Sequence, residues 1–128
     1  MSTGFTTIAL PNALRVTAPD GSQVDILAAC ARGSMARFTL DAGLVSKAVR
    51  HRSVEELWYI TAGSGEMWRS DGTNSEIVAL HPGVSLSIAA GVSFQFRSHG
   101  AGALEAIGVT MPPWPGMDEA DFVPGFWA

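Results

Sequence analysis

The sequence is short of charged residues, of cysteine and of long apolar runs. Charged residues make up 16% of its 128 positions, against about 25% in an average soluble protein. No segment approaches about 18 consecutive apolar residues, and the first residues lack the basic and apolar pattern of a secretory leader. We therefore expect no membrane partner and a cytoplasmic location. The single cysteine, Cys30, cannot form an internal disulfide, and its apolar neighbours predict a small buried hydrophobic residue.

The charge balance argues against nucleic acid as a partner. The net charge is −4 at pH 7, and the longest basic cluster is the Arg-His-Arg of residues 50–52. Proteins that bind nucleic acid usually carry many more clustered Lys and Arg side chains. Because hydrophobic residues reach 47% and charged ones are few, part of the apolar surface should be hidden between subunits. We therefore expect a homodimer.

The apolar pattern predicts an all-β protein with a single domain, residues 1–128. Short apolar or alternating runs recur at roughly eight- to twelve-residue intervals and are separated by Gly, Pro, Asp and Asn, as in β-sandwiches and barrels. No run has the length and period of a long amphipathic helix. The expected strands are residues 23–29, 34–40, 47–51, 56–62, 65–70, 76–80, 85–89, 93–98 and 103–111.

The C-terminal tail, residues 111–128, differs from the rest of the chain. It carries four prolines between residues 112 and 124, and proline cannot occupy a central strand because it lacks the backbone donor. It also holds two Trp and two Phe. We expect an extended segment that packs on the barrel or on a dimer partner, with a lid over a pocket as the alternative.

Two stretches carry glycines at a fixed spacing. In the first, residues 43–63, Gly43 is followed by five residues, then by Val49-Arg50-His51, four residues, Glu56, six residues and Gly63. In the second, residues 83–98, Gly83 is followed by five residues, then by Ala-Ala-Gly, two residues, Phe94, three residues and a serine. This spacing resembles the two motifs of the cupin superfamily, whose members are small jelly-roll barrels. The resemblance implies that fold here, with the Pro/Trp-rich tail extending from it.

The resemblance also locates the metal site that many cupins carry, and here that site is degenerate. In metal-dependent cupins, two His and a Glu of the first motif and a His of the second converge on one ion. The matching positions here are Val49, His51, Glu56 and Phe94, so two of the four ligands remain. Because a divalent ion usually needs three or more protein ligands, we expect no metal cofactor. An ion held weakly by His51 and Glu56 stays an alternative.

Strand alternation separates an inner from an outer set of side chains. The set expected inside the barrel is Val49, His51, Glu56, Trp58, Ile60, Phe94 and Phe96. The set expected outside or in an interface is Arg50, Arg52, Leu57, Tyr59, Gln95 and Arg97. Another alignment would put Arg50 and Arg52 in the two His positions and create an anion-binding cavity, but it breaks the distance to Gly43.

The inner set supplies the candidate site. His51 and Glu56 are the candidate catalytic pair, because a carboxylate beside an imidazole can tune it as an acid or base near neutral pH. The candidate ligand-binding residues are Val49, Trp58, Ile60, Phe94 and Phe96, which form an aromatic and aliphatic surface. A simpler interpretation makes His51 and Glu56 a buried, mutually satisfied pair and the aromatic residues ordinary core.

Three functions fit this pattern. The first is a metal-independent enzyme, of the isomerase, epimerase or lyase type, that acts on a small organic molecule with His51 and Glu56. The second is a non-catalytic cupin that binds or senses a small ligand. The third, a metal-dependent cupin enzyme, is disfavoured by Val49 and Phe94. The fold alone cannot choose among them, and an open pocket beside Phe94 is the decisive feature.

Overall fold

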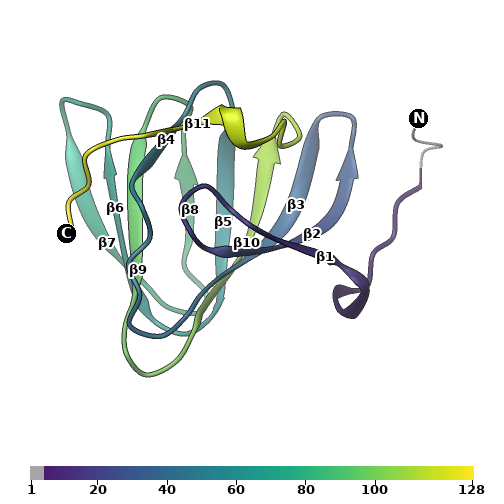
Figure 1. The fold of residues 1–128 in the computed structure, drawn as a ribbon, viewed down its shortest axis with the longest axis horizontal. Coiled ribbons are helices and arrows are strands. Elements are labelled where there is room, and N and C mark those ends of the chain that lie inside the picture. The colour runs from purple at the N-terminus through teal and green to yellow at the C-terminus, as the bar shows by residue number, and fades with distance from the viewer. Residues whose placement is uncertain (1–4) are drawn as a thin grey trace.

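Two antiparallel β-sheets pack face to face as a barrel in the computed structural model, which describes residues 5–128 (Figure 1). The six-stranded sheet has the order β1 (Leu14–Thr17), β2 (Gln23–Cys30), β3 (Gly33–Leu40), β10 (Leu104–Met111), β5 (Glu55–Ala62), β8 (Ser85–Ile88). The five-stranded sheet has the order β11 (Ala120–Phe122), β4 (Val49–His51), β9 (Ser93–Ser98), β6 (Gly65–Ser70), β7 (Ser75–Leu80). Two short 3-10 turns, η1 (Leu10–Asn12) and η2 (Met117–Glu119), complete the elements.

The all-β prediction is confirmed, and all nine predicted strands are present with ends within two residues of those expected. The sequence pattern missed two edge strands. The residues of β1 are all exposed, so the strand shows no alternation of buried and exposed positions. Strand β11 has only three residues and lies inside the proline-rich tail. Short edge strands carry little of the apolar signal on which sequence prediction depends.

Alternation along β5 decides which side chains reach the interior. Glu56, Trp58 and Ile60 are buried, whereas Leu57 and Tyr59 between them are about half exposed, at 52% and 53%. On the facing sheet, Val49, Phe94 and Phe96 are buried with them. The core therefore lies between the two sheets, and it includes the five apolar residues of the expected inner set, with His51 and Glu56 buried as well.

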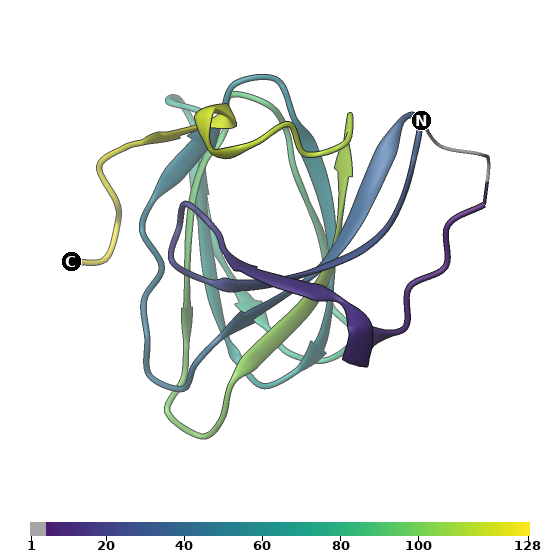
Figure 2. The same cartoon turned by 45° about the vertical axis from the view of Figure 1, so that its right-hand side comes forward.

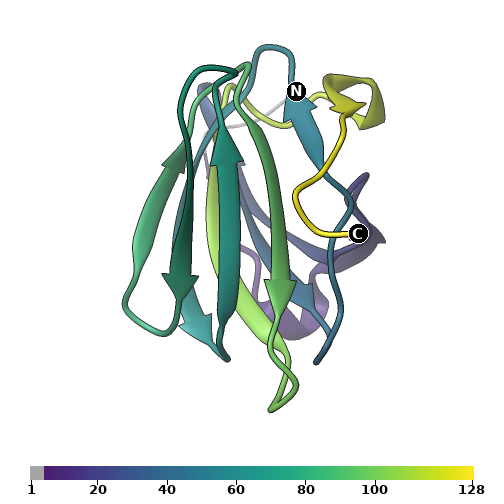
Figure 3. The same ribbon diagram turned by 90° about the vertical axis from the view of Figure 1, so that its left-hand side faces the viewer.

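The tail packs on its own barrel (Figure 3). Strand β11 pairs with β4 at the edge of the five-stranded sheet, and Arg52 forms an ion pair with Asp121 there. The Glu119 carboxylate accepts hydrogen bonds from the backbone N–H groups of Ser53 (2.5 Å) and Val54 (2.8 Å) in the turn before β5. The tail is thus held in one place across the barrel wall.

Gln95 corrects one prediction. Alternation points it out of the barrel, yet it is buried, because the end of the tail covers it. Its Oε1 accepts hydrogen bonds from the backbone N–H groups of Phe126 and Trp127, both at 2.9 Å, and its Nε2 donates to the carbonyl oxygen of Ser46 at 2.9 Å. A period-2 pattern gives the side of the strand but not what packs against it.

Cys30 corrects a second prediction. It is exposed, because it ends β2 at the turn into β3, where the hairpin projects from the barrel. Arg50 and Arg52 are exposed, as expected for the outer set, and Glu55 at the start of β5 is exposed too. No helix in residues 5–128 has the length and apolar character needed to cross a bilayer.

Gly65 supplies the first testable prediction. A Cβ at this position would collide with the carbonyl oxygen of Arg97 on the neighbouring strand β9. Gly65→Ala should therefore lower the free energy of unfolding by about 1–3 kcal/mol, the usual cost of overpacking. Gly102→Ala is the matched control, because a Cβ there has no atom within 4 Å. Urea unfolding that gives equal stabilities for the two variants would contradict the close packing of β6 on β9.

Candidate functional site

A cavity of about 310 Å³ opens between the two sheets. The β1–β2 hairpin and the tail lie on the same side of the barrel and contribute to its wall (Figure 2). Among the predicted site residues, the cavity is lined by Val49, His51, Glu56, Trp58 and Phe94. Ile60 and Phe96 are fully buried deeper in the core and do not line it. The space beside Phe94 is therefore open. Whether these residues bind a ligand stays a prediction.

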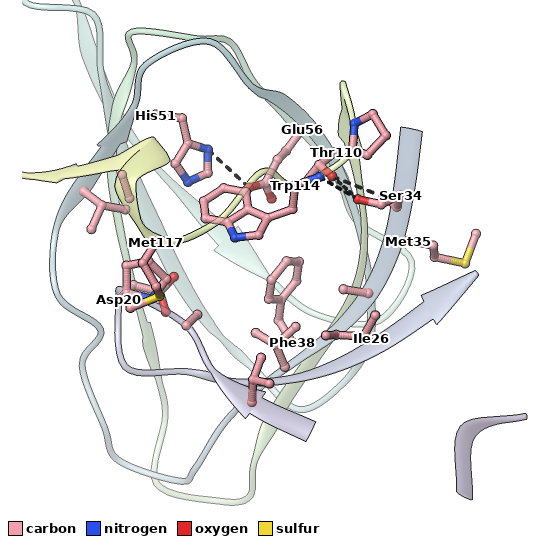
Figure 4. A pocket seen from close by; sticks show the side chains of 18 of the residues that line it. Asp20, Ile26, Ser34, Met35, Phe38, His51, Glu56, Thr110, Trp114 and Met117 are labelled. Atoms are coloured by element: carbon pink, nitrogen blue, oxygen red, sulfur yellow. Dashed lines mark hydrogen bonds and ion pairs between the residues drawn. The ribbon is translucent and has the colours of Figure 1, made fainter. Parts of the chain in front are cut away.

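His51 and Glu56 lie side by side at one end of the cavity (Figure 4). His51 is the last residue of β4 and Glu56 is near the start of β5, so the connection between these strands brings them together. The imidazole Nδ1 is 3.3 Å from the Glu56 Oε1, and both side chains are at least 95% buried. The pair does not meet the geometry of a hydrogen bond, and among residues 5–128 Nδ1 has no hydrogen-bond partner although it is buried.

Trp58 fixes the other oxygen of Glu56. Its indole Nε1 donates a hydrogen bond to the Glu56 Oε2 at 2.5 Å, because residues two apart on a strand share one face. The Trp58 ring itself stacks on Phe38, with centroids 4.9 Å apart. The carboxyl group is thus held by a rigid aromatic residue.

Aromatic rings also surround the imidazole. Phe94 approaches His51 edge to face, with centroids 5.2 Å apart, and Trp114 from the tail does the same at 4.9 Å. The backbone N–H of Trp114 donates to the Ser34 hydroxyl at 3.0 Å, which ties this part of the tail to β3. These rings exclude water from the pair.

Burial sets the charge state of the pair. It lowers the pKa of His51 from 6.5 to about 4, although the Glu119 carboxylate opposes the shift. Burial raises the pKa of Glu56 from 4.5 to about 7; the Trp58 hydrogen bond opposes this shift and the Asp20 carboxyl adds to it. Near pH 7 the imidazole is therefore neutral, and Glu56 is the group that exchanges a proton. From the sequence we expected the imidazole to be the acid or base tuned by the carboxylate, whereas the pKa shifts give that role to the carboxyl group.

The donor set does not fit a tightly held metal ion. Val49 and Phe94, at two of the four positions that the motif resemblance assigns to metal ligands, face the cavity with side chains that cannot coordinate. Within residues 5–128, no three His, Cys, Asp or Glu side chains are grouped closely enough to hold an ion. His81 and His99 are exposed and do not reach the site. Two donors, His51 and Glu56, remain.

The alternative alignment with Arg50 and Arg52 in the barrel is wrong. Both side chains are exposed, and Arg52 pairs with Asp121 on the outside, with Nη2 2.8 Å from Oδ1. The reason is the alternation of β4, which points Val49 and His51 inward and Arg50 outward.

Sequence reasoning missed several residues that line the cavity. Asp20 reaches it from the turn between β1 and β2, Ser34 and Thr110 from β3 and β10, and Trp114 from the tail. The tail was expected to pack on apolar surface or cover a pocket, but nothing singled out Trp114. The turn signal at residues 18–22 could have located the Asp20 loop. It carries no information on which cavity the loop would border.

Comparisons with known proteins identify the fold. No protein-family model and no curated protein matches the sequence. KdgF from Halomonas sp. superposes with a TM-score of 0.73 at 16% identity, covering 87% of this chain and 96% of that one. An uncharacterised Klebsiella pneumoniae protein with a double-stranded β-helix domain superposes with a TM-score of 0.71 at 12% identity, covering 94% of this chain and 99% of that one. Streptomyces Pac13, a nucleoside dehydratase of which a single-residue variant was solved with uridine, gives 0.73 at 14%, covering 95% and 92%.

The chain has the cupin fold. The glycines at the motif spacing have a structural role in this fold. Gly43, Gly63, Gly83 and Gly91 all adopt a positive φ, between 76° and 97°. Residues with a Cβ rarely adopt this conformation. The cupin motifs thus encode turns of the barrel independently of any metal site.

The opposed pKa shifts predict how stability depends on pH. The native state retains a proton on Glu56 between pH 4.5 and about 7 that the unfolded state has released, so this group's stabilisation is lost as the pH rises. Glu56→Gln should therefore gain stability relative to the unmodified protein over this range, by up to about 3 kcal/mol.

His51 should show the opposite slope. The unfolded state protonates this residue below pH 6.5, whereas the native state does so only near pH 4. The stability of His51→Gln should therefore rise relative to that of the unmodified protein as the pH falls from 6.5 to 4. Urea unfolding across this range measures both effects. Curves for both variants that run parallel to that of the unmodified protein would contradict the assigned charge states.

Proposed function

We propose that this cupin is a metal-independent enzyme of the isomerase, epimerase or lyase type that moves a proton on a small organic molecule. The observation that carries the proposal is the buried Glu56 carboxyl, whose pKa of about 7 suits general acid and base chemistry, at the wall of an open cavity. A group that is half protonated near neutral pH can both accept and return a proton.

The surroundings support distinct roles for the pair. Trp58 holds the Glu56 Oε2 and leaves Oε1 beside His51. The neutral imidazole of His51 has an unpartnered Nδ1, which can donate to or accept from a substrate oxygen without adding charge. Glu56 is then the proton-transfer residue, and His51 positions the substrate.

The structural neighbours are consistent with this class of chemistry. Pac13 is a nucleoside dehydratase, and dehydration removes a proton and a hydroxyl group from adjacent atoms. At 13–16% identity, these neighbours support the barrel as a scaffold for such a reaction without indicating the substrate.

A non-catalytic ligand-binding cupin is the second candidate. The cavity favours it in one respect, since most of its lining is apolar or aromatic. Such a lining can hold a small molecule without reaction. Proton exchange with solvent separates the two candidates, because binding alone exchanges no carbon-bound hydrogen.

Deuterium incorporation tests the catalytic proposal. Chelator-treated protein is incubated in D₂O with a library of small hydroxy and carbonyl compounds, and mass spectrometry detects mass gain or loss of water. Glu56→Gln should reduce turnover by about 10²- to 10⁴-fold, the usual contribution of a general acid or base. Glu55→Gln, on the exposed side of the same strand, is the matched control and should leave turnover unchanged.

His99→Gln serves as the corresponding control for His51→Gln, because His99 is exposed and does not line the cavity. Turnover that survives both Glu56→Gln and His51→Gln would remove the pair from the mechanism. Turnover that is lost on chelation and restored by a metal would contradict metal independence.

We also propose that two copies associate through the outer face of the six-stranded sheet. Leu57 and Tyr59 on β5 expose about half of their surface, and Met35 on β3 exposes 40%. The strand register places Val109 of β10 between Leu57 and Met35, which makes the apolar patch continuous. Contiguous apolar surface of this kind usually marks an interface.

Sedimentation tests this association. The unmodified protein should sediment as a dimer. Tyr59→Glu should sediment as a monomer, because its dimer would have to bury an unpaired charge in the interface. Ile77→Glu is the control, because Ile77 is an exposed apolar residue on β7 of the other sheet. A concentration-independent monomer for the unmodified protein would overturn the proposal.

A further inference from the structure

The cavity is lined by acidic side chains and a histidine. Among the lining side chains of residues 5–128, Asp20, His51 and Glu56 are the ones that titrate, and none is Lys or Arg. The nearby arginines are engaged elsewhere: Arg15 and Arg37 both pair with Asp25, which alternates with the cavity residues Val24 and Ile26 and so faces away. The described lining therefore offers carboxyl oxygens as hydrogen-bond acceptors but no Lys or Arg cation.

Asp20 is held rigidly with one oxygen in use. It lies in the turn between β1 and β2, where its Oδ1 accepts hydrogen bonds from the backbone N–H (2.9 Å) and hydroxyl (2.7 Å) of Ser22. Its carbonyl oxygen accepts from the Lys47 N–H at 2.8 Å. The Oδ2 has no hydrogen-bond partner within residues 5–128, although the residue is 93% buried.

The turn alone does not account for this carboxyl. An Asx-type turn needs one acceptor, which asparagine or serine also supplies. The second oxygen, Oδ2, is not among the fully enclosed polar atoms without a partner, and because Asp20 lines the cavity, this oxygen is open to a ligand there. Burial raises the pKa of Asp20, although the Ser22 hydrogen bonds oppose the shift. A hydrogen-bond donor on a ligand in the cavity would complete the group.

The rest of the lining suits an apolar body. Trp58, Phe38 and Phe94 present aromatic surface, and Trp114 covers His51 from the tail. Figure 4 shows His51 and Glu56 at one end of the cavity, Phe38 and Ile26 at the opposite end, and Asp20 beside Met117 at the side. A ligand that spans this space would contact the acid/base pair, the aromatic wall and Asp20 together.

We propose that the cavity binds a small molecule that is not anionic, whose ammonium or hydroxyl group donates to the Asp20 Oδ2 and whose apolar body lies on the aromatic wall. This inference rests on the proposed function only in placing the ligand in the same cavity. An anionic ligand would meet two carboxyl groups and no cation.

A matched set of phenyl compounds tests the charge selectivity. Phenethylamine, 2-phenylethanol and phenylacetate share one skeleton and differ in a cationic donor, a neutral donor and an anion. Quenching of tryptophan fluorescence reports binding, because Trp58 and Trp114 line the cavity. We expect the better of the amine and the alcohol to bind at least about tenfold tighter than phenylacetate at pH 7. The order of the two donors tells whether an ammonium or a hydroxyl fits better.

Asp20→Asn provides the second arm. Asparagine keeps the acceptor for the Ser22 turn but replaces the open acceptor with a donor. This change should weaken the preferred donor compound about tenfold and strengthen phenylacetate. Asp71→Asn is the matched control, because Asp71 also accepts backbone N–H groups in its turn, those of Thr73 and Asn74, but is exposed and outside the cavity.

Three results would overturn the proposal: phenylacetate binding as tightly as the donor compounds, no saturable binding of either donor compound, or an unchanged preference in Asp20→Asn. The ranking in the unmodified protein decides the matter alone if Asp20→Asn fails to fold. If only this inference fails, deuterium exchange that depends on Glu56 is still observed. If instead the ligand preference is observed but no deuterium exchange occurs, the proposed catalytic function fails and the protein is a binding protein.

Discussion

A carboxyl and an imidazole buried together are the constraint on which the rest of the site depends. With Nδ1 of His51 3.3 Å from Oε1 of Glu56 and both side chains almost fully buried, the apolar surroundings favour the uncharged forms of both groups. Val49 and Phe94 line the cavity beside the pair and carry no charge, so a proton neutralises the buried carboxyl.

The tail makes this burial possible. Glu119 is buried itself, which opposes ionisation, but hydrogen bonds from Ser53 and Val54 keep its pKa below the usual value. The resulting anchor holds the tail across the barrel, where Trp114 packs on His51 and Met117 and Ala120 complete the wall. Without these contacts the imidazole would meet water, and the reason for its lowered pKa would disappear. The tail is therefore part of the site, because it excludes solvent as well as adding surface to the barrel.

The sequence was sufficient for the fold and for the interior of the barrel, because both depend on local period. Alternation assigned Glu56 rather than Glu55 to the inside, and glycine spacing marked turns that do adopt a positive φ. What it missed depends on contacts between distant segments. Gln95 is buried by residues some thirty positions later, and Asp20 and Glu56 come to share a cavity through the β1–β2 hairpin. No local pattern encodes such pairings. The assumption that a cysteine in an apolar run is buried failed at Cys30 because that run ends at the turn of a hairpin.

The charge state of His51 tests the central claim most directly. Nitrogen-15 NMR of the three imidazoles distinguishes neutral from protonated rings, and the exposed His81 and His99 give separate signals in the same sample. The structure predicts that His51 stays neutral from pH 8 down to about pH 5 and titrates near 4. A His51 ring that is protonated at pH 6.5 would contradict the neutral imidazole on which this account of the site depends.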